Sequence, residues 1–418
     1  MLHNSARKLG NIILIFRQIT PALKIYRNLS EAVIENLQAI FQDNKYADKV
    51  IEKVLKSNPK WGARDRRFIA ETTYDIVRWY RLFKELADAE EGDYWKLFGI
   101  WCIWNKTELP DWEELEGLNQ KKIVAAYEHL KGTRKVRESI PDWMDELGEK
   151  EVGDRWDNEL EALNQEASVV LRVNTLKVSR KELQTQLTGE EIETEAPKEF
   201  PDALILEERQ NIFTRQQFKD GLFEVQDAGS QLIAPYLQVQ PGMRVIDACA
   251  GGGGKTLHLA ALMQNKGRII AMDTEQWKLD ELKKRARRAG VANIEPRLIE
   301  SSKTIKRLEN SADRLLLDVP CSGLGVLRRN PDAKWKLNMD FIDRVKELQQ
   351  HILKDYSPMI KPSGMMVYST CSILHTENED QVQKFISESE SKFELIEEKR
   401  IWPSDGFDGF YMALIKKK

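Results

Sequence analysis

The chain has 418 residues, of which 41% are hydrophobic and 31% are charged, and its formal net charge at pH 7 is -3. These values are typical of an ordinary soluble globular protein and exclude one that is basic over its whole surface, while a local basic groove for nucleic acid stays compatible with them. A chain of this length is expected to contain roughly two to four domains.

The first 150 residues are expected to form an all-helical domain. SEAVIENLQAIF opens with a serine cap and has apolar residues at helical spacing. Eight of the 11 tryptophans precede residue 160, and the simplest interpretation is that they fill a helical core. The alternative is that arginines of this segment face RNA, since arginine suits phosphate contacts and base stacking. Those arginines are Arg64, Arg66, Arg67, Arg78 and Arg81.

Near the N-terminus, the apolar stretch LGNIILIF has eight residues. A bilayer span needs about 20 residues, and the stretch has no small-residue cleavage site, so it predicts a buried helix rather than a membrane span or a signal peptide. No association with a membrane is expected.

Residues 155–240 and residues 241–418 have different patterns. The β-branched run SVVLRVNTLK and the extended pieces that follow it predict a small α+β domain over 155–240. After residue 241, helical patterns separate short apolar runs, which are RVIDA, RIIAMD, RLLLDV and MMVYST. This alternation predicts an α/β domain whose parallel sheet has helices on both faces.

The stretch DACAGGGGKTLHLA, residues 247–260, follows the first of these apolar runs. A P-loop would need a glycine in place of Cys249, and a dinucleotide fingerprint would need one in place of Thr256, so neither phosphate-binding motif is present. Asp273 ends the next apolar run, where an acid holds ribose hydroxyls in dinucleotide folds. A ligand with adenosine but no phosphate fits this pattern, and S-adenosylmethionine is the common one. The alternative for Asp273 is a helix N-cap without a ligand.

The chain contains four cysteines, which are Cys102, Cys249, Cys321 and Cys371. None form a C-x-x-C pair, so no zinc ribbon and no metal site is expected, and the low count indicates a reduced, cytoplasmic protein. Cys321 follows Asp318 just past one strand, and Cys371 stands just past another. Because ligands bind at the carboxyl ends of parallel strands, both thiols are expected on the same rim as the glycine turn. The alternative for either cysteine alone is a small buried hydrophobic residue.

Four motifs together carry a resemblance to a known family. FEVQDAGSQL, DACAGGGGKT, DVPCSGLGVLRRNPDAKWK and YSTCSILHTENED resemble the RsmB/NOP/Sun family of RNA 5-methylcytosine methyltransferases over residues 165–418, as does the closing DGFDGFYMALIKKK. WGARDRRFIAETTYDIVRWYR is similar to the NusB-like RNA-binding domain of the bacterial RsmB-type members. The resemblance implies a Rossmann-like methyltransferase with a mostly parallel seven-stranded sheet, preceded by a small α+β subdomain and an all-α N-terminal domain.

The resemblance also implies roles for individual residues. Cys371 is then the nucleophile that attacks cytosine C6, and Cys321 is the second thiol, which helps to remove the C5 proton and release the product. Asp318 would hydrogen-bond cytosine, and Lys255 would be an active-site cation, the alternative being an ordinary lysine at a helix start. The expected cofactor contacts are Asp247, Ala248, Cys249, Ala250, Gly251, Gly252, Gly253, Gly254, Lys255, Asp273, Lys278, Glu300 and Asp318.

Two departures from the family pattern concern the cofactor. The family usually has Ala-Pro where this chain has Gly251 and Gly252, and glycine adds backbone entropy to the loop. In RLIESSKT an aspartate commonly marks the adenine site of the family, and Glu300 is the candidate to replace it.

RNA must reach the cofactor rim with its target base unpaired or flipped out. Two basic segments are candidates for RNA contact. They are KKRARR at 283–288, whose alternative is a solvated helix face, and the segment with Arg328, Arg329, Lys334, Trp335 and Lys336. The expected substrate is ribosomal RNA, and the protein is expected to be a monomer. The alternatives are a transfer RNA cytosine methyltransferase and a ribosome-assembly factor that has lost turnover.

Overall fold

The computed structural model describes residues 24–418, and the LGNIILIF stretch lies outside them. Within these residues no helix has both the length and the apolar composition needed to cross a membrane. The chain divides into two compact units. The first consists of Met1–Leu147 with Asn330–Lys336, and the second consists of Gly148–Arg329 with Leu337–Lys418.

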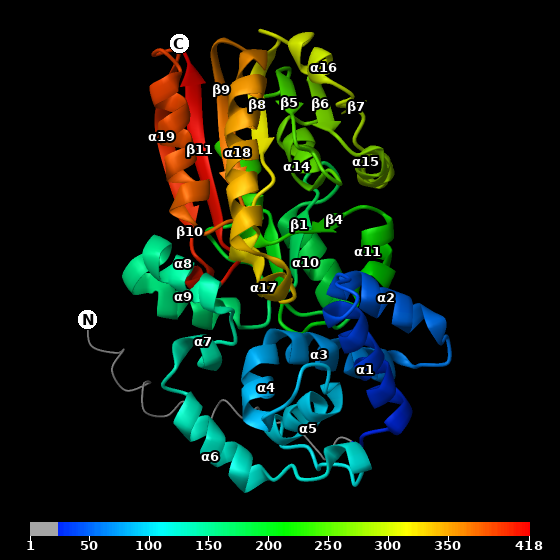
Figure 1. The fold of residues 1–418 in the computed structure, drawn as a ribbon. Coiled ribbons are helices and arrows are strands. Elements are labelled where there is room, and N and C mark those ends of the chain that lie inside the picture. Colours follow the sequence, from blue (N-terminus) through cyan, green and yellow to red (C-terminus); the bar gives the residue numbers. More distant parts are fainter. Residues whose placement is uncertain (1–23) are drawn as a thin grey trace, which may run out of the picture. The chain divides into compact units, whose positions relative to one another are not determined.

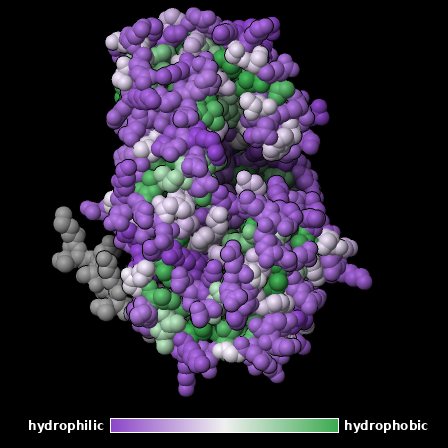
Figure 2. Space-filling model, in the orientation of Figure 1, coloured by the Kyte–Doolittle hydropathy of each residue, from purple (hydrophilic) through white to green (hydrophobic). Residues whose placement is uncertain are grey.

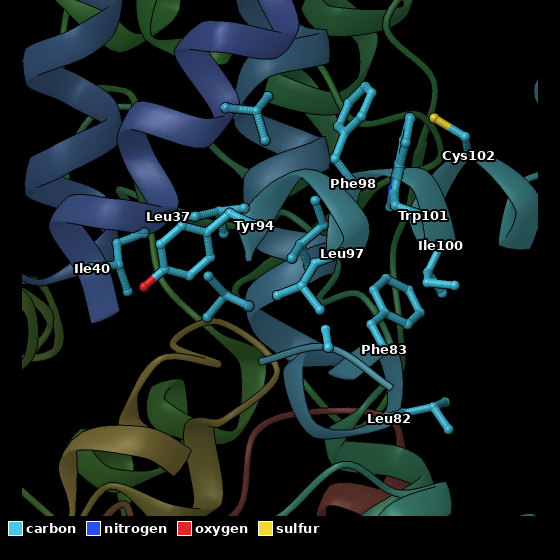
Figure 3. Packing of buried hydrophobic residues seen from close by; sticks show 14 of the residues in the cluster. Leu37, Ile40, Leu82, Phe83, Tyr94, Leu97, Phe98, Ile100, Trp101 and Cys102 are labelled. Atoms are coloured by element: carbon cyan, nitrogen blue, oxygen red, sulfur yellow. The ribbon is translucent and has the colours of Figure 1, made fainter. Parts of the chain in front are cut away.

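The described part of the first unit is helical (Figure 1). Its helices are α1 (Arg27–Phe41), α2 (Ala47–Ser57), α3 (Ala63–Arg78), α4 (Tyr80–Ala87), α5 (Tyr94–Trp104), α6 (Gln120–Leu130), α7 (Arg134–Arg137), the start of α8 (Asp142–Val152), and α17 (Ala333–Lys336). The sequence of α5, YWKLFGIWCIW, is apolar on nearly every side, and a helix of that kind is stable when other helices surround it. Figure 3 shows its side chains packed among those of α1 and α4.

The aromatic residues of this unit fill its core, as the simplest interpretation of the sequence expects. Trp101 is 5% exposed, and further tryptophans pack partly buried against the same core. They are Trp61, Trp79, Trp95, Trp104 and Trp112. The alternative, an RNA-facing row of arginines, is wrong for Arg66 and Arg78, because Arg66 donates to the Leu55 carbonyl and Arg78 is buried.

Residues 330–336 belong to the first unit although they lie between strands of the second unit's sheet in the sequence. Lys334 is 1% exposed, and its Nζ donates to the carbonyls of Arg78, Glu138 and Ser139. The indole of Trp335 donates to the Val77 carbonyl at 2.7 Å. The expectation that Lys334 contacts RNA is therefore wrong in this structure, because its side chain is buried in the helical core. Trp335 is half-buried against the same core.

The second unit begins with helices and a small antiparallel sheet. The helices are the rest of α8, α9 (Trp156–Leu163), α10 (Arg180–Thr188) and α11 (Gln216–Lys219). The sheet has the order β2-β3-β1-β4, formed by β1 (Val170–Val173), β2 (Thr194–Glu195), β3 (Ala203–Leu206) and β4 (Phe223–Val225). Leu171, Val173 and Phe223 form part of its core. The segment predicted as α+β thus contains both strands and helices.

A seven-stranded sheet of order β10-β11-β9-β8-β5-β6-β7 forms the rest of the second unit (Figure 1). Its strands are β5 (Arg244–Asp247), β6 (Arg268–Asp273), β7 (Ile294–Leu298), β8 (Ala312–Asp318), β9 (Ile360–Thr370), β10 (Phe393–Ile401) and β11 (Phe410–Lys417). All pairings from β7 to β9 are parallel, and β11 runs antiparallel to both its neighbours. The prediction of a mostly parallel, Rossmann-like sheet is confirmed.

Alternate residues of these strands build two hydrophobic layers. Leu315 and Leu317 of β8 pack in one layer with side chains of α18 (Met339–Tyr356) and α19 (Glu379–Glu388), while Leu316 packs in the other with α13 (Ile233–Tyr236) and α14 (Gly254–Leu262). The remaining helices are α12 (Ala228–Gln231), α15 (Gln276–Ala289) and α16 (Ser302–Lys306). The surface in view in Figure 2 is mostly hydrophilic, which agrees with helices that bury their apolar faces against the sheet.

Candidate active site

Four parallel strands end at the residues that begin the site. The strand β5 ends at Asp247, β6 at Asp273, β8 at Asp318 and β9 at Thr370, one residue before Cys371. Because neighbouring parallel strands point the same way, their carboxyl ends form one rim. The segments that follow the four strands meet there, and hydrogen bonds between them define the geometry.

The glycine turn connects β5 to α14. Gly253 has a φ of 87°, and a Cβ on it would lie 2.7 Å from Leu282, so both its backbone conformation and the available space require glycine. Gly251 also has a positive φ, of 54°, and its N–H donates to Oδ2 of Asp273 at 3.0 Å. The turn and the acid at the end of β6 are therefore joined directly.

Asp273 is 8% exposed and accepts a second hydrogen bond, from the N–H of Glu275, at 2.9 Å. That bond belongs to the turn before α15, but the N-cap residue of α15 is Glu275, so the N-cap interpretation of Asp273 is wrong. Lys278 forms an ion pair with Glu275 at 2.9 Å and lies 3.7 Å from Asp273. Glu300 is exposed beyond the end of β7.

A cavity of about 320 Å³ opens between the glycine turn and β4. Its lining residues are Val225, Gln226, Ser230, Asp247, Cys249, Ala250, Gly251, Gly252, Gly254, Lys255, Arg285 and Asp318. Eight of the expected cofactor contacts are in this set, whereas Ala248, Gly253, Asp273, Lys278 and Glu300 are outside it. The sequence did not predict that Gln226, Ser230 and Arg285 line the cavity. Gln226 and Ser230 belong to the motif FEVQDAGSQL, and Arg285 belongs to the basic segment KKRARR.

The polar groups of the cavity fit S-adenosylmethionine. Asp247 accepts from the Thr256 hydroxyl at 2.7 Å, while its other oxygen is buried and has no hydrogen-bond partner within the described chain. Burial raises the pKa of Asp247 to about 7. A buried oxygen of this kind requires a donor, which the ammonium or ribose hydroxyls of the cofactor can supply. Asp247 and the glycine turn are the residues of this cavity that would hold the cofactor, and Asp273 accepts a hydrogen bond from Gly251 of that turn.

The two predicted thiols meet beside this cavity. The sulfurs of Cys321 and Cys371 lie 3.1 Å apart, and the N–H of Cys371 donates to the sulfur of Cys321 at 3.3 Å. Both cysteines are free thiols. The hydrogen bond to Cys371 and burial together raise the pKa of Cys321 well above its usual value. The Cys321 thiol therefore stays protonated at neutral pH, and either sulfur can be the donor in the contact between them.

Lys255 and Asp318 form a close pair on the same rim. The Lys255 Nζ lies 2.5 Å from Oδ2 of Asp318, and the Ser369 hydroxyl donates to the other oxygen at 2.9 Å. Burial opposes the charge on Lys255, but the Asp318 carboxylate outweighs it and raises the pKa of Lys255. The pair supplies a fixed cation and a fixed carboxylate beside the thiols.

The two arginines that follow the Cys321 loop are used inside the second unit. Arg328 is 4% exposed and donates to the carbonyls of Ala162 and Gly406. Arg329 bridges Asp227 and Asp408 at 2.8 Å and 2.5 Å. The expectation of RNA contact is therefore wrong for Arg328, because its guanidinium is buried and bonded to backbone, and Arg329 has both nearby acids as partners.

The basic segment 283–288 is divided between two environments. Arg285 and Arg288 both pair with the buried carboxylate of Glu224, and Arg285 also donates to the Gly252 carbonyl at 2.8 Å. Lys283 and Lys284 are exposed. Arg285 thus connects the small sheet, α15 and the glycine turn at the edge of the cavity.

The strand order, the glycine turn and the rim of acids define the chain as an S-adenosylmethionine-dependent methyltransferase. The family described as 16S rRNA methyltransferase RsmB/F matches residues 234–416, and the RsmF/B-like ferredoxin-like domain matches residues 140–213. A probable ribosomal RNA small subunit methyltransferase B from Synechocystis sp. is 33% identical over 85% of this chain and 88% of its own length. The chain belongs to the RsmB/F methyltransferase family.

Further relatives agree with this assignment. A probable ribosomal RNA small subunit methyltransferase B from Bacillus subtilis is 36% identical over 59% of each chain. The crystal structure of a methyltransferase homolog from Pyrococcus horikoshii is 29% identical, with a TM-score of 0.61 over 68% of this chain and 98% of that one. The crystal structure of PH0851 has the same fold, with a TM-score of 0.81 over 95% of this chain and all of that one, at 24% identity.

Proposed function

We propose that this chain methylates carbon 5 of a cytosine in ribosomal RNA, with Cys371 as a covalent nucleophile. The observation that carries the proposal is the approach of two free thiols to 3.1 Å beside a cavity that fits the methyl donor. Two relatives carry the name ribosomal RNA small subunit methyltransferase B, which supports ribosomal RNA as the substrate class.

Carbon 5 of cytosine is a poor nucleophile until C6 is attacked. When the Cys371 thiolate bonds to C6, the electrons of the C5–C6 double bond shift so that C5 becomes enamine-like and nucleophilic. S-adenosylmethionine supplies the electrophilic methyl group. After methylation, a base would take the C5 proton, and the electron pair of that C–H bond would form the C5–C6 double bond as the bond between C6 and the sulfur breaks. The sulfur would leave with the electrons of that bond, which returns the thiolate to Cys371.

The other rim residues would support these steps. Asp318 would hydrogen-bond the N3–N4 edge of the cytosine, and Lys255, 2.5 Å from Asp318, would keep that carboxylate in place. Cys321, whose sulfur lies 3.1 Å from that of Cys371, would help to release the product. The target base must be unpaired or flipped out for its C6 to be reached.

Transfer of labelled methyl groups tests the proposal. The purified full-length chain is incubated with labelled S-adenosylmethionine and with small-subunit ribosomal RNA, transfer RNA or ribosomal particles, and methylated nucleosides are identified by mass spectrometry. We expect 5-methylcytosine in ribosomal RNA, free or in a particle. Label in transfer RNA alone would favour the second substrate class, and RNA binding without transfer would favour an assembly factor.

We further propose that the protein acts as a monomer in the cytoplasm. The first unit and the second unit each have a hydrophobic core of their own. Light scattering of the purified chain should give the mass of one copy, 48.4 kDa. A dimer mass at micromolar concentration would contradict the monomer.

A further inference from the structure

Glu377 is a fully buried carboxylate beneath the two cysteine loops. It stands six residues after Cys371, in the short helix η6 (His375–Glu377), and none of its surface is exposed. Burying a charged carboxylate is unfavourable unless hydrogen bonds replace water. The donors that surround Glu377 therefore indicate what the residue is for.

The donors come from the residues next to both cysteines. Ser322, which follows Cys321, donates its N–H to Oε2 at 2.8 Å and its hydroxyl to Oε1. Ser372, which follows Cys371, donates its hydroxyl to Oε1 at 2.5 Å. One side chain thus accepts hydrogen bonds from two loops that are 50 residues apart in the sequence.

A fourth donor comes from α18. Nε2 of Gln349 donates to Oε2 of Glu377 at 2.9 Å and also to the carbonyl of Pro320 at 3.0 Å. The residues on both sides of Cys321, Pro320 and Ser322, are therefore bonded to this network. Four donors use roughly all the acceptor positions of a carboxylate.

The residue after Glu377 holds the other loop in the same way. Nδ2 of Asn378 donates to the carbonyl of Ser372 at 3.0 Å, and its Oδ1 accepts from the Thr370 hydroxyl at 2.5 Å. Thr370 and Ser372 are the two neighbours of Cys371. Each cysteine is thus flanked on both sides by residues that Glu377, Gln349 or Asn378 anchors.

We propose that Glu377 is a positioning residue, which acts as a clamp that sets the distance between the sulfurs of Cys321 and Cys371. Its side-chain contacts are to the serines next to the cysteines and to Gln349, not to the thiols. The proposed role is geometric, and the Glu377 carboxylate also contributes to the raised pKa of Cys321. Glu377→Gln should therefore retain much of the geometric role, because an amide oxygen can accept from the two N–H donors while the serine hydroxyls turn to accept from the amide NH₂.

Disulfide formation measures the clamp without any RNA. The reduced full-length chain is treated with diamide, a thiol oxidant that takes two electrons and two protons from a pair of thiols and leaves a disulfide. Peptide mapping by mass spectrometry follows the Cys321–Cys371 disulfide. We expect rapid formation in the unaltered chain, slowing of roughly tenfold to a hundredfold in Glu377→Ala, since displacement of reacting groups by about 1 Å has effects of that order, and a rate near the unaltered one in Glu377→Gln.

Glu159→Ala is the matched control. Glu159 is also fully buried and accepts from Ser404 N–H and hydroxyl at 2.9 Å and 2.7 Å, without a bond to either cysteine loop. Glu159→Ala should lower the stability of the protein without slowing the formation of the Cys321–Cys371 disulfide. If Glu377→Ala fails to fold, the double variant Ser322→Ala with Ser372→Ala removes both hydroxyl donors and should show the same slowing to a smaller degree. Equal rates in the unaltered chain and in these variants would overturn the clamp, as would a Glu377→Gln rate as slow as that of Glu377→Ala.

Methyl transfer gives a second readout, which rests on the proposed function. Glu377→Ala should lower kcat for methylation while the KM for S-adenosylmethionine stays within about twofold, because the cavity residues are untouched. A raised cofactor KM with an unchanged kcat would contradict the role. If no RNA is methylated even by the unaltered chain, the proposed function fails while the disulfide experiment still decides the clamp.

Discussion

The sulfur atoms of Cys321 and Cys371 lie 3.1 Å apart although 50 residues separate them in the chain. Each follows the carboxyl end of a parallel strand, β8 or β9, and these strands are neighbours in the sheet. The hydrogen bond between the two sulfurs and burial raise the pKa of Cys321. The different tasks proposed for these two cysteines are tested by replacing each one separately.

Replacing Cys371 with alanine should abolish methylation and also any covalent adduct with RNA. The sulfur of Cys371 is the atom proposed to bond to C6, and the sulfur of Cys321, 3.1 Å away, is given a different role. Methyl transfer and denaturing gel electrophoresis with labelled RNA measure the two effects. Retained adduct in Cys371→Ala would mean that Cys321 is the nucleophile.

Replacing Cys321 with alanine should allow attack but block release. The protein is then expected to stay covalently attached to RNA, and the adduct should accumulate in the presence of S-adenosylmethionine. Gel shift under denaturing conditions detects it. Normal turnover by Cys321→Ala would contradict the role given to this thiol.

Replacing Asp318 with asparagine should lower kcat/KM by roughly a hundredfold, because it removes the proposed cytosine contact and leaves the partly buried Lys255 without its carboxylate. Asp313→Asn is a suitable control, since Asp313 lies at the other end of the same strand and pairs with Lys361. Steady-state methylation assays compare the two variants. Equal losses in both would indicate a general effect on the sheet.

Replacing Trp335 with alanine should destabilise the first unit by about 3 kcal/mol, through lost packing and the lost hydrogen bond to Val77. Hydrogen exchange followed by mass spectrometry should report faster exchange in α3 and α4. Unchanged exchange together with weaker RNA binding would instead support the RNA-contact interpretation of this residue.

Stability should depend on pH through His258, which is 2% exposed. Burial lowers the pKa of His258 from 6.5 to about 4, against the opposing hydrogen bond to Asp202, while Arg172 adds repulsion. Between these two values the unfolded chain binds the proton and the folded chain does not, so this contribution to the free energy of unfolding is complete above pH 6.5 and is lost as the pH falls toward 4.

The full contribution is about 3 kcal/mol. Urea unfolding at several pH values measures this effect. Between pH 4 and 6.5, the free energy of unfolding should rise more steeply with pH for the unaltered chain than for His258→Asn, whose amide can still donate to Asp202. Parallel curves for the two proteins would contradict the assignment.

The sequence alone indicated the sheet and much of the rim. Apolar runs that end in Asp247, Asp273 and Asp318 identified strand ends, and parallel strands place their ends together whatever the connecting helices contain. Local patterns of this kind depend on a few adjacent residues, so they can be read from the chain. Cys321 and Cys371 were found in the same way, by their places after two strands.

Only the tertiary structure decided how individual charged side chains are used. Lys334 and Arg328 have the composition of an RNA-binding segment, yet both are buried and bonded to backbone carbonyls from distant parts of their own unit. Glu377 resembles any surface glutamate near a helix start, yet it joins the two cysteine loops. The physical reason is that burial and the choice of partners depend on contacts between residues far apart in the sequence, and the local pattern around a charge does not contain that information.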